Sequence, residues 1–365
     1  MYLFSNSIVF LFFLVHIILL ALALAIAVTS AKKADDIGVV IIFCAYCLLN
    51  FSRNGYGVDE PVYLDAYKDY LKDGTLYFEY SFNFIYLVFS KLDVEPVFFN
   101  HLFSVLFIFL AVLMIKKSVN KPYQSLGLVF FLFFSITLDF VFNAYRQGMA
   151  FLFIAISLCY FFQNHKKRAI LFFIIGLGFH WSSIVVALAV ILRKFLSFKN
   201  AVRLNILIFI MTTIAMVIPL HIIPLVTFIL SKVSFVSPYI LKITGYLDSP
   251  IAYFYDLNFM GRLPMIASVL AMLSIFYIYR KVIPQFFYKI VMLLMLYCLS
   301  FLEMSYSFRN YYWVLPFLPI IMANIPEYLN SAKGKKSALV IVSVLHMMLA
   351  ITGYYTSGIM PLIFL

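Results

Sequence analysis

Long runs of apolar residues, separated by short polar segments, extend along almost the whole chain. Many of these runs approach the length of about 20 residues that a helix needs to cross a bilayer. Backbone polar groups inside a bilayer must be satisfied within their own segment, so the runs predict helices. The pattern therefore predicts an all-α integral membrane protein with about 12 transmembrane helices. We expect it to form a single polytopic membrane domain over residues 1–365.

The polar residues between the runs predict the topology. Short basic clusters, such as Lys32 with Lys33 and Lys116 with Lys117, mark cytoplasmic loops under the positive-inside rule. The N-terminus is then outside, and Met1–Ser30 is a retained first helix, because it has no basic region before its apolar run. The predicted spans are Phe4–Ala27, Ile37–Phe51, Pro96–Ile115, Ser125–Phe142, Arg146–Phe162, two short arms in Ala169–Leu192, Val202–Leu220, Gly261–Tyr279, Phe286–Glu303, Tyr311–Ile325 and Ala338–Tyr355.

Two longer polar stretches fall on the outer side of this topology, at residues 52–95 and 220–260. In the first, Pro61 and the apolar spacing that follows predict a short helix lying on the membrane surface. Phe82–Leu92 is too short to span and is either interfacial or re-entrant. Both stretches are predicted as external loops.

Ala169–Leu192 lies between two cytoplasmic basic clusters, so it must cross an even number of times or not at all. We therefore predict a short re-entrant-like hairpin with His180 and Trp181 near its tip. Each arm of about a dozen residues rises roughly 18 Å, less than the core thickness of about 30 Å. The tip, with His180, is expected in a cavity below the outer surface.

Composition agrees with the membrane assignment and narrows the function. The chain is 65% hydrophobic and only 12% charged, which excludes an ordinary soluble domain. Its net charge of +12 lies in the short clusters between apolar runs, so it indicates topology and no nucleic-acid partner. All four cysteines lie inside apolar runs and imply no disulfide framework.

Four arginines depart from the positive-inside bias, because each lies at or next to the external end of a predicted span. They are Arg53, Arg146, Arg262 and Arg309. A guanidinium keeps its proton and binds phosphate with a planar fork, so this set suits the head group of a lipid diphosphate. The alternative is that each arginine anchors a helix end by snorkelling.

Two further residues carry candidate acid–base chemistry. His180 is either a general base or hydrogen-bond donor, or a histidine satisfied within a packed helix tip. Asp59 is either a base for an acceptor hydroxyl or one acid of a solvated face. The chain has no phosphate-binding glycine loop, HExxH or DxD motif, so we expect no metal and no cofactor.

Four short motifs, in order along the chain, resemble those of the EpsG/Wzy-like bacterial polysaccharide polymerases. The first combines Arg53, Gly57, Asp59 and Tyr63, with Val58 in place of the usual Thr; the second is Ala144–Ala150, including Arg146 and Gln147; the third is Phe179–Ser183, including His180; the fourth is Arg309 with Tyr311 and Tyr312. The resemblance covers most of the chain, from Arg53 to Ile325.

The resemblance implies a GT-C-like glycosyltransferase, an O-antigen or polysaccharide polymerase. Such an enzyme joins oligosaccharide repeat units carried on undecaprenyl diphosphate, without a metal, at the periplasmic face of the bacterial inner membrane. Its partners would be these glycans, membrane lipid and a separate chain-length regulator. The implied catalytic residues are Asp59, Arg146 and His180, and the implied substrate-binding residues are Arg53, Tyr63, Gln147, Arg309 and Tyr312.

Two other classes stay open. A flippase for lipid-linked oligosaccharides would need charge distributed through its spans, whereas the central runs here are free of charge. An O-antigen ligase would share the chemistry but transfer to lipid A core, and the pattern from Arg53 to Tyr63 argues against it. Loss of a polymerase would leave core capped with a single repeat unit; loss of a ligase or flippase would leave bare core.

Overall fold

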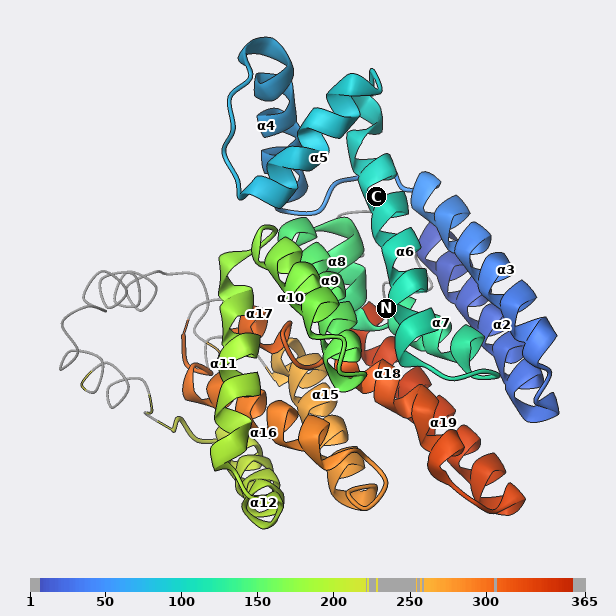
Figure 1. Ribbon diagram of the computed structural model, residues 1–365. Coiled ribbons are helices and arrows are strands. Elements are labelled where there is room, and N and C mark those ends of the chain that lie inside the picture. The colour runs from blue at the N-terminus through green and yellow to red at the C-terminus, as the bar shows by residue number, and fades with distance from the viewer. Residues whose placement is uncertain are drawn as a thin grey trace. The chain divides into compact units, whose positions relative to one another are not determined.

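The computed structural model of the chain describes residues 7–220, 222, 228, 254, 257, 259–304 and 307–356 (Figure 1). Within these residues the chain is helical and contains no β-strand. It forms two compact units: unit 1 comprises residues 1–184 and 316–365, and unit 2 comprises residues 185–315. The second predicted external loop, residues 220–260, lies almost wholly outside the described residues.

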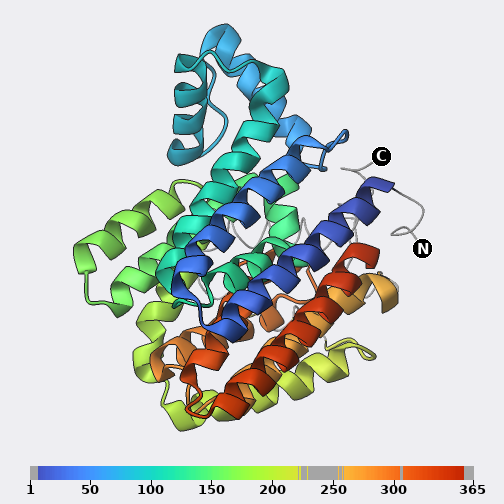
Figure 2. The same ribbon diagram turned by 90° about the vertical axis from the view of Figure 1, so that its right-hand side faces the viewer.

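Unit 1 is built on long apolar helices that lie against one another (Figures 1 and 2). They are α2 (Ser7–Thr29), α3 (Lys32–Phe51), α6 (Phe99–Ser118), α9 (Tyr145–Phe162) and α19 (Ala332–Thr356). Helices α2 and α19, from opposite ends of the chain, meet at a buried contact in which the Nε2 atoms of His16 and His346 are 2.9 Å apart. The first and last described helices thereby belong to one bundle.

One predicted span of unit 1 is bent at a break. The predicted helix Ser125–Phe142 consists of α7 (Gln124–Leu132) and α8 (Ser135–Phe142), which meet at an angle of 71°. A break inside a membrane exposes backbone carbonyls that need a partner. Here the buried Tyr46 hydroxyl donates to the Leu132 carbonyl at 3.0 Å.

The first predicted external loop forms a helical lobe, which we define as α4 (Glu60–Asp73), α5 (Tyr80–Lys91) and η1 (Pro96–Phe98). Figure 1 shows it at one end of α6. Helix α4 has a proline in its first turn and ends at Gly74, whose φ of +78° suits a glycine cap. The helix predicted after Pro61 is therefore confirmed as a helix, and most of Phe82–Leu92 lies in α5; the position of both segments at a membrane surface stays a prediction.

The opposite end of unit 1, which we call the basic end, holds the predicted cytoplasmic clusters. Buried Asp35, in the first turn of α3, accepts hydrogen bonds from the Gln124 and Ser125 amides at 3.1 and 2.8 Å. Lys121 pairs with Asp36 at 2.5 Å. The Lys117 ammonium lies 4.4 Å from the centre of the Tyr160 ring, next to the cluster at residues 165–168. The starts of α3, α7 and α10 thus lie together at this end.

The predicted hairpin region contains two short helices, as expected. Helix α10 (Lys166–Leu177) ends before Gly178, a turn follows through His180, and η2 (Trp181–Ser183) leads into α11 (Ile184–Leu192). Neither helix is long enough to span a bilayer by itself. The helix break that was predicted from charge alone is therefore present at His180.

Unit 2 contains α12 (Phe198–Ala215), α15 (Phe259–Ile278), α16 (Gln285–Ser300) and α17 (Phe308–Tyr311). The span predicted over Tyr311–Ile325 differs from the structure, because the chain there turns after α17 and resumes as α18 (Phe317–Asn324) and η5 (Ile325–Tyr328). Pro316 lies at this break, and a proline disfavours helical backbone in the residue before it.

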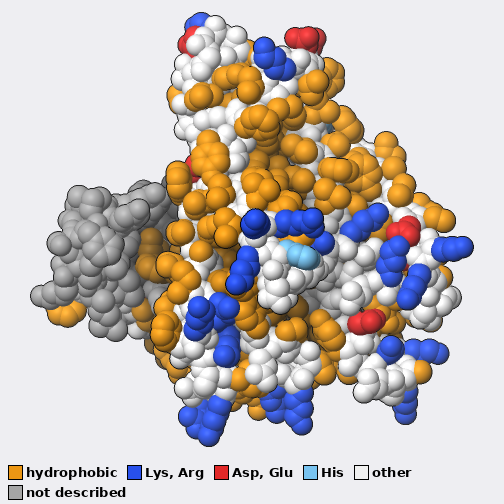
Figure 3. All heavy atoms as spheres, viewed as in Figure 1, with side chains coloured by type: hydrophobic (Ala, Val, Ile, Leu, Met, Phe, Trp, Pro, Cys, Tyr) orange, Lys and Arg blue, Asp and Glu red, His pale blue; other side chains and the backbone are white. Residues whose placement is uncertain are grey.

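Seven helices of the described chain are long and apolar enough to cross a membrane, or eight if α7 and α8 count as one span. They are Ser7–Thr29, Lys32–Phe51, Pro96–Ser118, Tyr145–Phe162, Phe198–Ala215, Gly261–Ile278 and Ala332–Gly353. Hydrophobic side chains cover much of the face in Figure 3, and Lys and Arg lie in separate groups. The protein is accordingly a multi-pass helical membrane protein.

Candidate functional site

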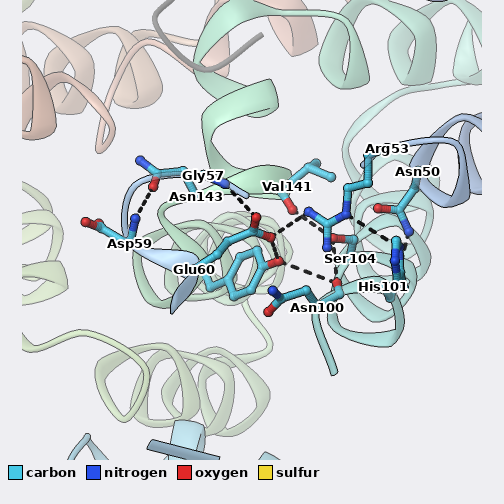
Figure 4. A network of polar contacts seen from close by, with 11 residues as sticks. Asn50, Arg53, Gly57, Asp59, Glu60, Asn100, His101, Ser104, Val141 and Asn143 are labelled. Atoms are coloured by element: carbon cyan, nitrogen blue, oxygen red, sulfur yellow. Dashed lines mark hydrogen bonds and ion pairs between the residues drawn. The ribbon is translucent and has the colours of Figure 1, made fainter. Parts of the chain in front are cut away.

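A buried ion pair organises the lobe end of unit 1. The Arg53 guanidinium, just after α3, lies 2.6 Å from the Glu60 carboxylate at the start of α4 (Figure 4). Burial lowers the pKa of Arg53, but the neighbouring Tyr145 and Glu60 oxygens outweigh that cost and raise the pKa above its ordinary value. Arg53 therefore stays charged, and its ion pair with Glu60 connects the end of α3 to the start of α4 across the intervening loop.

Glu60 also binds the loop and α9. The Gly57 amide donates to its second carboxylate oxygen at 2.7 Å, and the buried Tyr145 hydroxyl donates to the oxygen that Arg53 contacts. Gly57 lies so close to α8 that an added Cβ would meet the Phe142 carbonyl oxygen at 2.0 Å. Only a glycine fits this approach, which accounts for the glycine of the first motif.

Asp59 is held beside this network but is not part of its ion pair. Its backbone amide donates to the Asn143 side-chain oxygen at 2.6 Å, and Asn143 in turn donates to the Asp139 carboxylate at 2.9 Å. The Asp59 side chain is half-buried and points away from Glu60 and Arg53 (Figure 4). The turn thus leaves the Asp59 carboxylate half-exposed, whereas the carboxylate of the neighbouring Glu60 is buried.

Arg146, the second residue of α9, is held by the lobe. Its Nη1 lies 2.9 Å from the Glu79 carboxylate, and its guanidinium carbon lies 4.7 Å from the centre of the Phe78 ring. The Arg146 side chain also donates to the Tyr63 hydroxyl oxygen. The buried Nε has no hydrogen-bond partner within the described residues. The guanidinium therefore keeps donor capacity next to a helix N-terminus, where anions are favoured.

His180 lies in the turn after α10, and the lobe holds that turn. The Ser81 amide donates to the Gly178 carbonyl at 2.9 Å, and an added Cβ on Gly178 would meet the Tyr80 ring at 2.2 Å. The His180 Nδ1 accepts from the Ser182 amide at 3.2 Å. A backbone amide can only donate, so this nitrogen carries no proton, and the neutral ring presents an N–H at Nε2.

Most of the predicted site residues are therefore on elements that meet at the lobe end of unit 1. Tyr63 stacks on Tyr145 with ring centroids 5.3 Å apart, which brings the first motif against the second. Gln147 is buried one residue beyond Arg146. The lobe contacts the turn that carries His180 through Ser81. The structure thus gathers the first three motifs.

The fourth motif lies in unit 2. Arg309 is half-buried in α17, and the buried Tyr312 ring packs edge-on against Phe308 at 5.8 Å. Their participation in a site with the first three motifs stays a prediction.

Sequence reasoning overlooked the residues that hold the predicted ones. Glu60 adjoins Asp59, and nothing along the chain says which of two neighbouring acids turns inward. Glu79 lies within the first predicted loop, Asn143 lies between two predicted spans, and Tyr145 lies in the second motif without a role of its own. The one available signal was the cation at Arg146, since a partly buried guanidinium needs a carboxylate nearby.

Within the described residues, no group of three or more His, Cys, Asp or Glu side chains could hold a metal ion.

Fold and site together define a multi-pass helical membrane protein that carries cations and half-buried polar side chains at one end of its larger unit. The chain belongs to the EpsG family, whose model matches residues 36–364. Membership indicates a glycosyltransferase-like polysaccharide polymerase. No curated protein and no solved structure matched the chain.

Proposed function

We propose that the protein is a polysaccharide polymerase that joins repeat units carried on undecaprenyl diphosphate. The observation that carries the proposal is the EpsG family match together with the position of Arg146, whose guanidinium is partly exposed at an α-helix N-terminus. We assign the lobe end to the outer, periplasmic face of the bacterial inner membrane, because the basic end is the cytoplasmic side under the positive-inside rule. The same proposal includes a GT-C-like fold with about 12 spans, a single membrane domain and a chain-length regulator as partner.

In the proposed reaction, the acceptor hydroxyl oxygen bonds to C1 of the donor sugar. The bond between C1 and the diphosphate oxygen breaks, and the diphosphate leaves with the electron pair. Arg146 binds the oxygens on which negative charge develops, which is electrostatic stabilisation without a metal. Tyr63 and Gln147 are assigned to the surroundings of Arg146, and Arg309 and Tyr312, in unit 2, are kept as candidate substrate-binding residues.

The hydrogen bonds of His180 favour one division of roles. Because its Nδ1 accepts from Ser182, the Nε2–H of the neutral ring is suited to donate to a diphosphate oxygen. Asp59, half-buried and held by its backbone, is then the base that accepts the hydroxyl proton. Arg53 is buried and paired with Glu60, so we assign it to positioning the Asp59 turn instead of direct diphosphate contact.

The test is the length distribution of surface polysaccharide in a deletion strain complemented with wild type, Arg146→Ala or His180→Ala. Membrane levels of each variant are measured as the control. We expect both variants to insert normally and to yield only single-repeat material. Full-length polysaccharide from both variants would refute the site assignment, and bare acceptor without any repeat would favour a ligase or flippase.

A further inference from the structure

The strongest contact of Arg146 is with a residue to which neither the motifs nor the proposed reaction gives a role. Glu79 lies 2.9 Å from Nη1, and its side chain is 8% exposed, whereas that of Arg146 is 29% exposed. Glu79 is the N-cap residue of α5, yet its side chain makes no capping hydrogen bond there. The Glu79 carboxylate therefore pairs with Arg146 and does not cap its own helix.

A carboxylate and a phosphate oxygen make the same kind of hydrogen bond to a guanidinium. Glu79 therefore occupies a donor of Arg146 that a diphosphate would also use. Meanwhile the buried Nε of Arg146 has no hydrogen-bond partner within the described residues. If Glu79 paired with every donor on its side of the guanidinium, Nε would have a partner. Glu79 therefore satisfies the Arg146 guanidinium only in part.

The segment that carries Glu79 also holds the turn before His180. Tyr80 donates to the Ile174 carbonyl at 2.5 Å, and Ser81 donates through its hydroxyl to the Ile175 carbonyl at 3.0 Å. The Ser81 amide reaches the Gly178 carbonyl. Ile174 and Ile175 lie in the last turn of α10 and Gly178 follows it directly, where carbonyls lack a full set of donors from their own helix, although the Gly178 amide also donates to Ile174 at 3.0 Å. One short segment therefore connects the counter-ion of Arg146 to the helix end that precedes His180.

We propose that Glu79 is a built-in counter-anion that holds Arg146 while the site is empty and that the diphosphate of the substrate displaces. Displacement frees residues 78–81 to shift, and the turn that carries His180 shifts with them. Glu79 is thus a positioning residue that links anion binding at Arg146 to the orientation of His180. This inference rests on the proposed function, because it takes an anionic diphosphate as the ligand.

The test compares binding of farnesyl diphosphate, a short isoprenyl diphosphate, to wild type, Glu79→Gln and Glu79→Asp in lipid nanodiscs. Glu79→Gln keeps the shape and removes the competing charge, so we expect about three- to tenfold tighter binding. Glu79→Asp keeps the charge and should bind close to the wild-type affinity. Asp69→Asn is the matched control, since Asp69 lies in the same lobe and pairs with the neutral Tyr77 at 3.0 Å.

The outcomes separate this inference from the function on which it rests. Unchanged or weaker binding in Glu79→Gln, with binding still abolished by Arg146→Ala, would overturn the counter-anion and leave the proposed function standing. If Asp69→Asn tightened binding of the probe equally, the change would follow from net charge alone, and the counter-anion would be overturned as well. Probe binding that Arg146→Ala does not weaken would overturn both.

The link to His180 has its own readout in hydrogen exchange of the Ser81 amide. We expect this amide to exchange faster when the probe is added to wild type, and faster without the probe in Glu79→Gln. Exchange that responds to neither change would overturn the coupling. The Gly74 amide, bonded to the Tyr70 carbonyl at 2.9 Å in the same lobe, is the internal control and should not change.

Discussion

Arg53 and Glu60 form an ion pair of 2.6 Å in which the two side chains are 2% and 0% exposed. A buried pair of this kind is weak evidence for stability in itself, but removal of one partner leaves the other charge uncompensated. Glu60 in addition joins the loop at Gly57 to α9 at Tyr145. This pair therefore couples the fold of the lobe end to the position of the neighbouring Asp59.

The first prediction contrasts these two adjacent acids. Glu60→Gln should destabilise the protein by about 3–5 kcal/mol, because it leaves the Arg53 charge buried without its partner. Asp59→Asn, at a half-buried position outside the ion pair, should leave the stability within about 0.5 kcal/mol and abolish polymerisation. Thermal unfolding in detergent and polysaccharide length, measured on both variants, check the contrast. Equal destabilisation by the two substitutions would contradict it.

A second prediction concerns the glycine of the same turn. Gly57→Ala would place a Cβ 2.0 Å from the Phe142 carbonyl oxygen, so the turn must move away from α8 and carry Asp59 with it. We expect short or absent polysaccharide at normal membrane levels. Gly74→Ala is the control, because no atom lies within 4 Å and only its positive φ is strained, at a cost of about 1 kcal/mol. Wild-type chain length from Gly57→Ala would disprove the role of this turn.

A third prediction separates two roles for His180. If its Nε2–H donates to the leaving diphosphate, Gln places an amide N–H near that position and should retain part of the activity, roughly a tenth. Asn places its amide near Nδ1 and should lose activity at least tenfold further. The measurement is the polymerisation rate of the two variants in reconstituted membranes. Equal loss in both, together with loss of the acidic limb of the pH–rate profile, would indicate a general base instead.

A fourth prediction tests the basic end of unit 1 as purely structural. Asp35 accepts from both the Gln124 and Ser125 amides, so it caps the start of α7 from another helix. Asp35→Ala removes both bonds and should destabilise the protein by about 1–2 kcal/mol. The activity per inserted molecule should stay at the wild-type level. A large loss of that activity without a change in melting temperature would contradict a purely structural role.

Much of the fold followed from the chain alone, because a bilayer permits so few solutions. Apolar runs such as Pro96–Ile115 predict helices wherever backbone groups must be satisfied internally, and α6 is one of them. The break before His180 was predicted from the basic clusters on either side. The break between α7 and α8 was not, since the Tyr46 hydroxyl that satisfies Leu132 comes from a distant segment.

The sequence by itself determined the membrane class, the positions of the motifs and the family to which they belong. Only the tertiary structure decided which charges are buried and which meet. Adjacent residues in the first turn of a helix differ by about 100° in direction, so packing against Arg53 and Tyr145 turned Glu60 inward and left Asp59 outward. Likewise Arg146 meets Glu79, 67 residues earlier, through the docking of the lobe. Charge pairing depends on distance in space, and no local pattern along the chain encodes that distance.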